Sequence, residues 1–137
     1  MEAINDYHII EKIADIRGIT YYRGRKTDQS PPVIIEFINV DRASHSKIAQ
    51  LKNEYEKIRQ LDRSSAIPVY EVFDYQDGIA VVTEEFTEKP LNKRFSPGKT
   101  DIDKFLKHAS NLSRALGDIH SCGIIHRAIT PANILSN

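Results

Sequence analysis

The stretch Gly-Ile-Ile-His-Arg-Ala-Ile-Thr-Pro-Ala-Asn-Ile-Leu, residues 123–135, decides the fold because it sets polar side chains at a characteristic spacing. His126 and Arg127 are adjacent, and Asn133 follows near the end of the stretch. Ala128 comes directly after the arginine, and its methyl group can neither accept a proton nor bind a metal ion. The spacing therefore indicates a structured loop in which position 128 carries no polar side chain.

Bulk properties describe an ordinary globular chain. Its 137 residues are 40% hydrophobic and 28% charged, which suits about one domain with a modest core. Nineteen basic residues balance nineteen acidic ones, so the charge indicates neither nucleic acid nor a membrane surface as a partner. Residues 1–6 lack the features of a secretory signal, and the single cysteine, Cys122, suits a reducing compartment. We therefore expect a cytoplasmic protein.

Hydrophobic periodicity predicts an α+β order of elements. Alternating or continuous apolar runs indicate five strands, and Asp77-Gly78 is a typical hairpin signal between the last two. Apolar residues recurring every three or four positions indicate two helices, the second of which Gly123 ends. The predicted elements are strands 7–13, 20–25 and 33–38, helix 44–62, strands 69–75 and 79–86, a polar connector 87–100, and helix 101–121.

This order, together with the loop, resembles the protein kinase family from its small lobe through the catalytic-loop pattern H-R-D-x-x-x-x-N. The resemblance implies a five-stranded antiparallel sheet with one helix in residues 1–90. Residues 91–137 would then be a linker, a long helix and a truncated catalytic loop from an incomplete large lobe. More narrowly, the tail looks like the kinase-type domains that open large bacterial multi-sensor signalling proteins.

The same resemblance implies that the catalytic loop has lost its chemistry. In the family, the aspartate accepts the proton of the substrate hydroxyl, and the asparagine holds a magnesium ion. His126, Arg127 and Asn133 match the pattern, whereas Ala128 replaces the aspartate and Thr130 replaces the loop lysine. We expect no metal site; Asn133 would bind magnesium only if a nucleotide binds, and would otherwise tie the loop to backbone groups.

The resemblance also implies a change in the ion pair that positions the phosphates in the family. Glu36 stands where the family has its third-strand lysine, and Glu54 matches the glutamate of the following helix. Two facing carboxylates would replace an ion pair. At ~4 Å, an electrostatic attraction of about 4 kcal/mol would become a repulsion of the same size. An arginine at position 17, 23 or 25 is the alternative source of positive charge.

The expected nucleotide cleft is also altered. Ala14, Ile16 and Ile19 occupy the three glycine positions of the phosphate loop, where side chains would hold the backbone away from a triphosphate. Larger residues than usual stand over the adenine position, so the cleft roof is expected to be filled from within. The cleft positions carried over from the family are Tyr21, Ile34, Thr83, Glu84 and Phe86.

Two further patterns invite a site interpretation and do not support one. His120, Cys122 and His126 provide three candidate ligands without the spacing of a zinc site. Residues 96–100 end like a phosphate-binding P-loop, but the required first glycine is Lys93, so we expect a turn.

The leading hypothesis is a catalytically inactive, kinase-like (pseudokinase) signalling or protein-interaction module that needs no cofactor. The alternatives are the N-terminal part of an ATP-binding serine/threonine protein kinase, which would use ATP and Mg²⁺, and a decayed gene fragment without function. The expected partner is a protein or a neighbouring signalling domain, and not a nucleic acid or a membrane. An exposed apolar face on helix 101–121 would also favour self-association.

Overall fold

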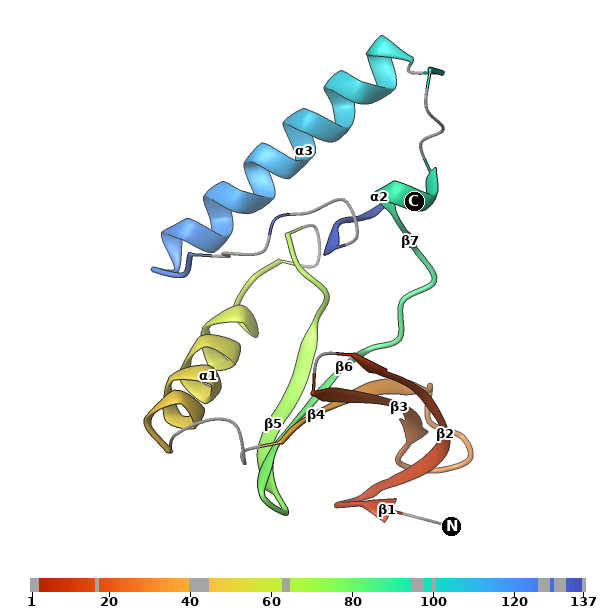
Figure 1. Ribbon diagram of the computed structural model, residues 1–137, viewed down its shortest axis with the longest axis vertical. Coiled ribbons are helices and arrows are strands. Elements are labelled where there is room, and N and C mark those ends of the chain that lie inside the picture. Colours follow the sequence, from red (N-terminus) through yellow and green to blue (C-terminus); the bar gives the residue numbers. More distant parts are fainter. Residues whose placement is uncertain are drawn as a thin grey trace. The chain divides into compact units, whose positions relative to one another are not determined.

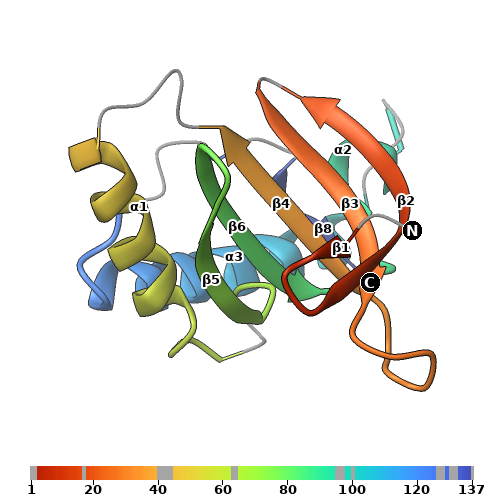
Figure 2. The same ribbon diagram turned by 90° about the horizontal axis from the view of Figure 1, so that it is seen from below.

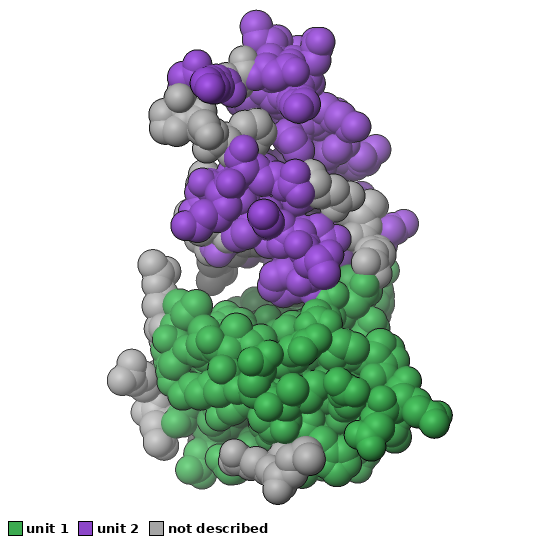
Figure 3. Space-filling model, turned by 90° about the vertical axis from the view of Figure 1, so that its right-hand side faces the viewer, with its two compact units in different colours: residues 1–60, 67–85 green, residues 61–66, 86–137 purple. Residues whose placement is uncertain are grey.

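The computed structural model describes residues 3–16, 18–39, 45–62, 65–94, 98–99, 101–125, 129 and 133–136. It divides into two compact units, which Figure 3 colours separately. Unit 1 comprises residues 1–60 and 67–85, and unit 2 comprises residues 61–66 and 86–137.

Unit 1 is an antiparallel sheet with one helix, as Figures 1 and 2 show. Its six strands are one more than the sequence predicts, because a two-residue strand at the N-terminus is too short for periodicity to reveal. The spatial order is β1 (Ala3–Ile4), β2 (Tyr7–Ile16), β3 (Ile19–Arg25), β4 (Val33–Asn39), β6 (Gly78–Glu84) and β5 (Val69–Tyr75).

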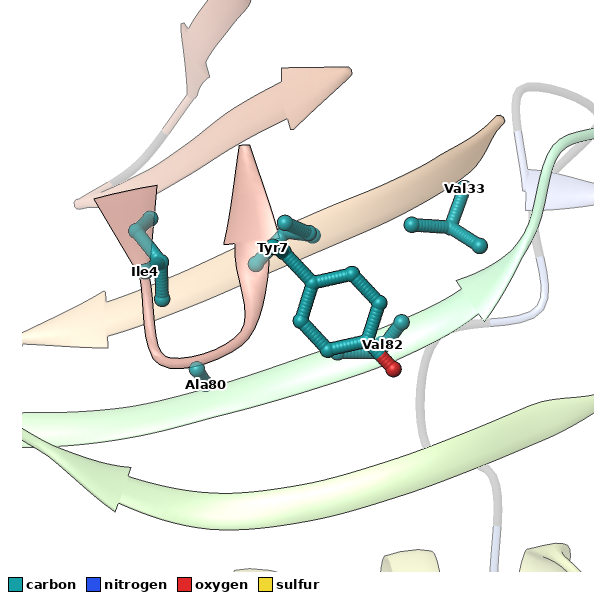
Figure 4. Close-up of a cluster of buried hydrophobic side chains, with 6 residues drawn as sticks. Ile4, Tyr7, Val33, Ala80 and Val82 are labelled. Atoms are coloured by element: carbon teal, nitrogen blue, oxygen red, sulfur yellow. The ribbon is translucent and has the colours of Figure 1, made fainter. Parts of the chain in front are cut away.

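Alternation along the strands builds an apolar core on each face of this sheet. On one face, Tyr7 and Ile4 pack with the buried residues Val33, Ala80 and Val82, as Figure 4 shows. The opposite face buries another set of aliphatic residues, Val69, Ile79 and Val81, beneath the helix α1 (His45–Ile58). The apolar stripe of α1 covers that face through Ile48, Leu51, Tyr55 and Ile58. The α+β small-lobe architecture predicted from the sequence is thus present.

The β5–β6 hairpin differs in detail from its sequence signal. Tyr75 pairs with Gly78, so the two turn residues are Gln76 and Asp77. Gln76 has a positive φ of 49°. Gly78 is required for a different reason: a Cβ there would lie 2.0 Å from the carbonyl oxygen of Ile38. The glycine therefore permits close approach of two strands and does not supply the positive φ.

Unit 2 contains the long helix α3 (Ile102–Ser121), which ends as predicted and begins one residue after the predicted start. The Asp101 side chain caps it by accepting hydrogen bonds from the backbone N–H groups of Asp103 and Lys104, at 3.0 and 3.5 Å. At the other end, Gly123 has a φ of 75°, and its N–H donates to the carbonyl of His120 at 2.9 Å. Ser65 joins the unit through a hydrogen bond from its hydroxyl to the Asp118 carboxylate.

The segment predicted as a polar connector contains regular structure. Strand β7 (Lys89–Pro90) pairs with β8 (Leu135–Ser136), and a single helical turn, α2 (Leu91–Arg94), follows it. The Leu91 N–H donates to the Ile134 carbonyl at 2.9 Å, so the pairing depends on residues far along the chain. Of the P-loop-like residues 96–100, Gly98 (φ 79°) and Lys99 are described, and the rest lie outside the described residues.

None of the described helices is both long enough and apolar enough to span a membrane.

Candidate functional site

Strand β4 places Glu36 on the face of the sheet that α1 covers. The strand register sets it opposite Tyr21 of β3 on one side and opposite Val81 of β6 on the other. Glu36 points away from the core that contains its neighbour Ile35, because adjacent residues of a strand face opposite sides. Its side chain is largely buried, and burial raises the pKa of this carboxyl to about 7, since the charged form loses its hydration.

Two tyrosines share this environment with Glu36. Burial raises the pKa of the Tyr55 hydroxyl, and the nearby Glu36 charge raises it further, followed by Tyr21 and Glu54. The pKa of Tyr21 is raised by burial and then by Glu36. The structure thus gathers Tyr21, Glu36 and Tyr55 from three elements into one cluster, which we call the Glu36 cluster. In the sequence, Tyr55 falls on the apolar stripe of the predicted helix 44–62, and its hydroxyl is the signal of a polar role.

Glu54, the second predicted carboxylate, lies on α1 next to Tyr55. Its carboxylate accepts a hydrogen bond from Nε2 of Gln50, one turn earlier, at 3.2 Å. The charge of Glu54 contributes to the raised pKa of Tyr55, whereas the raised pKa of Glu36 is due to burial. The fold therefore perturbs the protonation of Glu36 through burial.

The candidate arginines that the structure describes contact groups other than Glu36. Arg23 lies on β3 two positions from Tyr21, but its Nε donates to Oε1 of Glu85 at 2.5 Å, and NH1 lies 3.9 Å from Glu11. Arg25 donates from NH1 to the backbone carbonyl of Asp28 at 3.2 Å. Arg17 lies outside the described residues. Neither described arginine supplies the charge of the missing lysine to Glu36.

The positions of the phosphate loop belong to a closed β-ladder. Ala14 pairs with Tyr21, and Ile16 pairs with Ile19, so the ladder continues to the last residue before the turn. Gly18, at a φ of 83°, turns the chain. All three positions predicted to correspond to the glycines are thus paired strand residues with side chains, and Ile16 is 56% exposed.

The remaining cleft positions divide between the two units. Ile34 and Thr83 are buried register partners on β4 and β6, and Oγ1 of Thr83 has no hydrogen-bond partner among the residues described. Glu84 ends β6, where its N–H donates to the Pro68 carbonyl at 3.0 Å. Phe86 is exposed and belongs to unit 2. The structure therefore brings Ile34 and Thr83 together within unit 1.

The catalytic-loop positions are mostly outside the described part of the chain. His126, Arg127, Ala128 and Thr130 fall there, and Asn133 is exposed just before β8. Within the described ranges, no group of three or more His, Cys, Asp or Glu residues could hold a metal ion.

Comparison with known proteins identifies the family. A family model described as the protein kinase domain matches residues 7–137. The chain belongs to the protein kinase family. Its sheet, its α1 helix and the long α3 helix are accordingly those of a kinase fold, whereas the correspondences of single site residues stay predictions.

Two kinases with similar sequences are much longer proteins. The chain is 30% identical over 133 residues to serine/threonine-protein kinase TIO of Arabidopsis thaliana, covering 96% of the chain and 10% of that protein. It is 29% identical over 129 residues to serine/threonine-protein kinase 36 of Mus musculus, covering 94% of the chain and 10% of that protein. The chain thus spans about a tenth of the length of these relatives.

The solved kinase domains share the fold at low sequence identity. Two structures of the PknI kinase domain of Mycobacterium tuberculosis superpose with TM-scores of 0.77 and 0.80, both at 14% identity. The matches cover 95% and 98% of this chain but 53% and 56% of the solved chains. About half of a kinase domain is therefore matched. The narrower likeness to bacterial multi-sensor proteins stays a prediction.

Proposed function

We propose that this chain is a degenerate kinase module that does not transfer phosphate and serves in signalling or protein interaction. The observation that carries the proposal is Glu36. Its carboxyl group stands at the position predicted for the family's lysine, is largely buried on the sheet face that α1 covers, and receives no basic side chain from the residues described. An ionised carboxylate there would repel the phosphates that a lysine would attract.

The sequence of the catalytic loop supports the same conclusion. Ala128 cannot accept a proton from a substrate hydroxyl, and Thr130 carries no charge to stabilise a transferring phosphoryl group. The paired strand residues at the phosphate-loop positions add a third obstacle. Each loss touches a different part of phosphoryl transfer, so compensating one of them leaves the others in place.

The alternative function is nucleotide binding as the N-terminal part of an active serine/threonine kinase. The printed names of the relatives favour it, since they are serine/threonine kinases. It requires ATP and Mg²⁺, with Asn133 as a metal ligand and with nucleotide contacts from Tyr21, Ile34, Thr83, Glu84 and Phe86.

Thermal unfolding with and without millimolar MgATP separates the two functions. A site of micromolar affinity would raise the free energy of unfolding by about 4 kcal/mol at a thousandfold ligand excess. We expect no shift in the melting temperature of the wild-type chain. A shift of several degrees together with phosphate transfer to a protein substrate would overturn the proposal. A shift that appears only in Glu36→Gln would identify charge repulsion as the block to nucleotide binding.

For the interaction role we propose self-association through the first turns of α3. Ile102, Phe105 and Leu106 are 70%, 55% and 57% exposed, which makes an apolar patch on one helix. A second copy is the proposed occupant because the net charge of zero gives copies of this chain no overall repulsion. Light scattering should show a mass that rises with concentration and falls in Phe105→Ser. A wild-type chain that stays monomeric at high concentration would contradict this role.

A further inference from the structure

Glu36 occupies an unusual place in the interface between α1 and the sheet. Its neighbours in register are Tyr21 and the fully buried Val81, and the helix above contributes Tyr55. That interface is otherwise built from aliphatic side chains, among them Ile48 and Leu51 of α1. A negative charge created there must either be hydrated or remain in an apolar contact, and the second is costly.

The titratable groups facing Glu36 offer no compensation. Tyr21 from β3 and Tyr55 from α1 are neutral near pH 7, since the pKa of each is raised above its ordinary value. Glu54, beside Tyr55, adds a charge of the same sign. Arg23, on the same face of β3, is held by Glu85. Among the groups that the structure describes around it, none balances an ionised Glu36.

We infer that Glu36 is a proton-sensitive latch for α1: the protonated carboxyl lets the helix pack on the sheet, and the ionised carboxylate weakens that packing. This inference goes beyond the proposed function and holds whether or not a nucleotide binds. The geometry makes α1 the element that yields, because β4 is held on both sides by strand ladders to β3 and β6. One polar contact from α1 to the sheet is an exposed ion pair, Lys52 to Asp74 at 3.1 Å, which contributes little.

The direction of the pH effect follows from the two states of the carboxyl. With α1 packed, the pKa of Glu36 is about 7, whereas a hydrated glutamate titrates near 4.5. The packed state is therefore fully favoured below about pH 4.5. It loses this advantage as the pH rises from there through about 7, and the effect levels off above that value.

Hydrogen exchange of the α1 amides between pH 6 and pH 8, corrected for intrinsic rates, tests the latch. We expect protection of the α1 amides to fall about tenfold over this range, relative to the amides of β4 and β6. In Glu36→Gln the protection should become independent of pH. Glu54→Gln is the matched control, because it removes a carboxylate from α1 itself and should keep the wild-type profile.

Three outcomes would overturn the latch. One is wild-type protection that does not change between pH 6 and pH 8. Another is a pH dependence that persists in Glu36→Gln, which keeps the five histidines that could also titrate in this range. The third is loss of the dependence in Glu54→Gln. If the glutamine variant does not fold, Glu36→Met repeats the test with a non-ionisable side chain of similar size.

Discussion

Two glutamates on the sheet of unit 1 have opposite electrostatic environments. Glu71 of β5 accepts hydrogen bonds from Lys26 Nζ at 2.7 Å and from the Tyr7 hydroxyl at 2.9 Å, and Lys26 lies 5.0 Å from the centre of the Tyr7 ring. The hydrogen bond from Lys26 is the main cause of the lowered pKa of Glu71. Burial beneath α1 instead raises the pKa of Glu36 to about 7.

The comparison shows that charge balance in a sequence does not ensure local charge balance. The chain has equal numbers of acidic and basic residues, yet one carboxyl has two donors and the other faces two tyrosines. The Glu71 side has the arrangement expected of a stable fold. The Glu36 side keeps a group that weakens the fold near neutral pH, which is typical of sites under a functional constraint.

The largest expected effect comes from disrupting the sheet that both glutamates share. Gly78→Ala would place a Cβ 2.0 Å from the Ile38 carbonyl oxygen and 3.2 Å from the Asn39 Cα, both backbone atoms that cannot rotate away. We expect a loss of about 3 kcal/mol in the free energy of unfolding, measured by urea denaturation.

Gly117→Ala is the matched control for this prediction. Gly117 lies inside α3, and a Cβ there would meet nothing within 4 Å. Alanine should therefore stabilise the helix by about 0.5–1 kcal/mol. Equal effects from the two substitutions would show that the close approach at Gly78 is not a constraint.

The next largest effect should come from removing the carboxyl of Glu36. Because its pKa is higher in the folded state, the wild-type chain loses about 3 kcal/mol between pH 4.5 and pH 8. Burying the amide of Glu36→Gln costs part of that amount, so we expect the variant to be about 2 kcal/mol more stable than wild type at pH 8. At pH 5 the two should be nearly equal. Urea denaturation at both pH values is the measurement, and destabilisation at pH 8 would contradict it.

The smallest effect should come from Glu71→Gln. The side chains of Lys26 and Glu71 are 45% and 36% exposed, so solvent screens the ion pair, and its loss should cost no more than about 1 kcal/mol. The contribution of Glu71 is present above its ordinary pKa and is lost as the pH falls through the lowered value. Chemical denaturation at pH 7 should therefore give a small loss, opposite in sign to the Glu36→Gln effect. A gain in stability would remove the distinction between the two sites.

Much of the fold was predictable because most elements are long and strongly periodic. The strand at 69–75 is found with the predicted bounds, and the helix predicted at 101–121 begins after its Asp101 cap. The short strands β1, β7 and β8 were missed because two residues carry no periodicity, and distant partners stabilise them. Tertiary contacts, not local pattern, decide such elements.

The candidate site was predictable in part. The position of Glu36 on its strand follows from alternation, but the cover that Tyr55 provides depends on how α1 packs, which the sequence does not specify. The ion pair between Arg23 and Glu85 joins residues 62 positions apart, so no local sequence pattern predicts it. The roles of the catalytic-loop residues 126–128 stay predictions, since those residues lie outside the described part of the structure.

The central claim is that the residue at the lysine position of this kinase fold is a buried carboxyl without a basic partner. A carbon-13 NMR titration of the Glu36 side chain in the wild-type chain tests it most directly, with Glu36→Gln to assign the signal. The account predicts an apparent pKa of about 7. A pKa at or below 4.5 would show that the carboxyl is hydrated or paired with a cation, and would contradict the account.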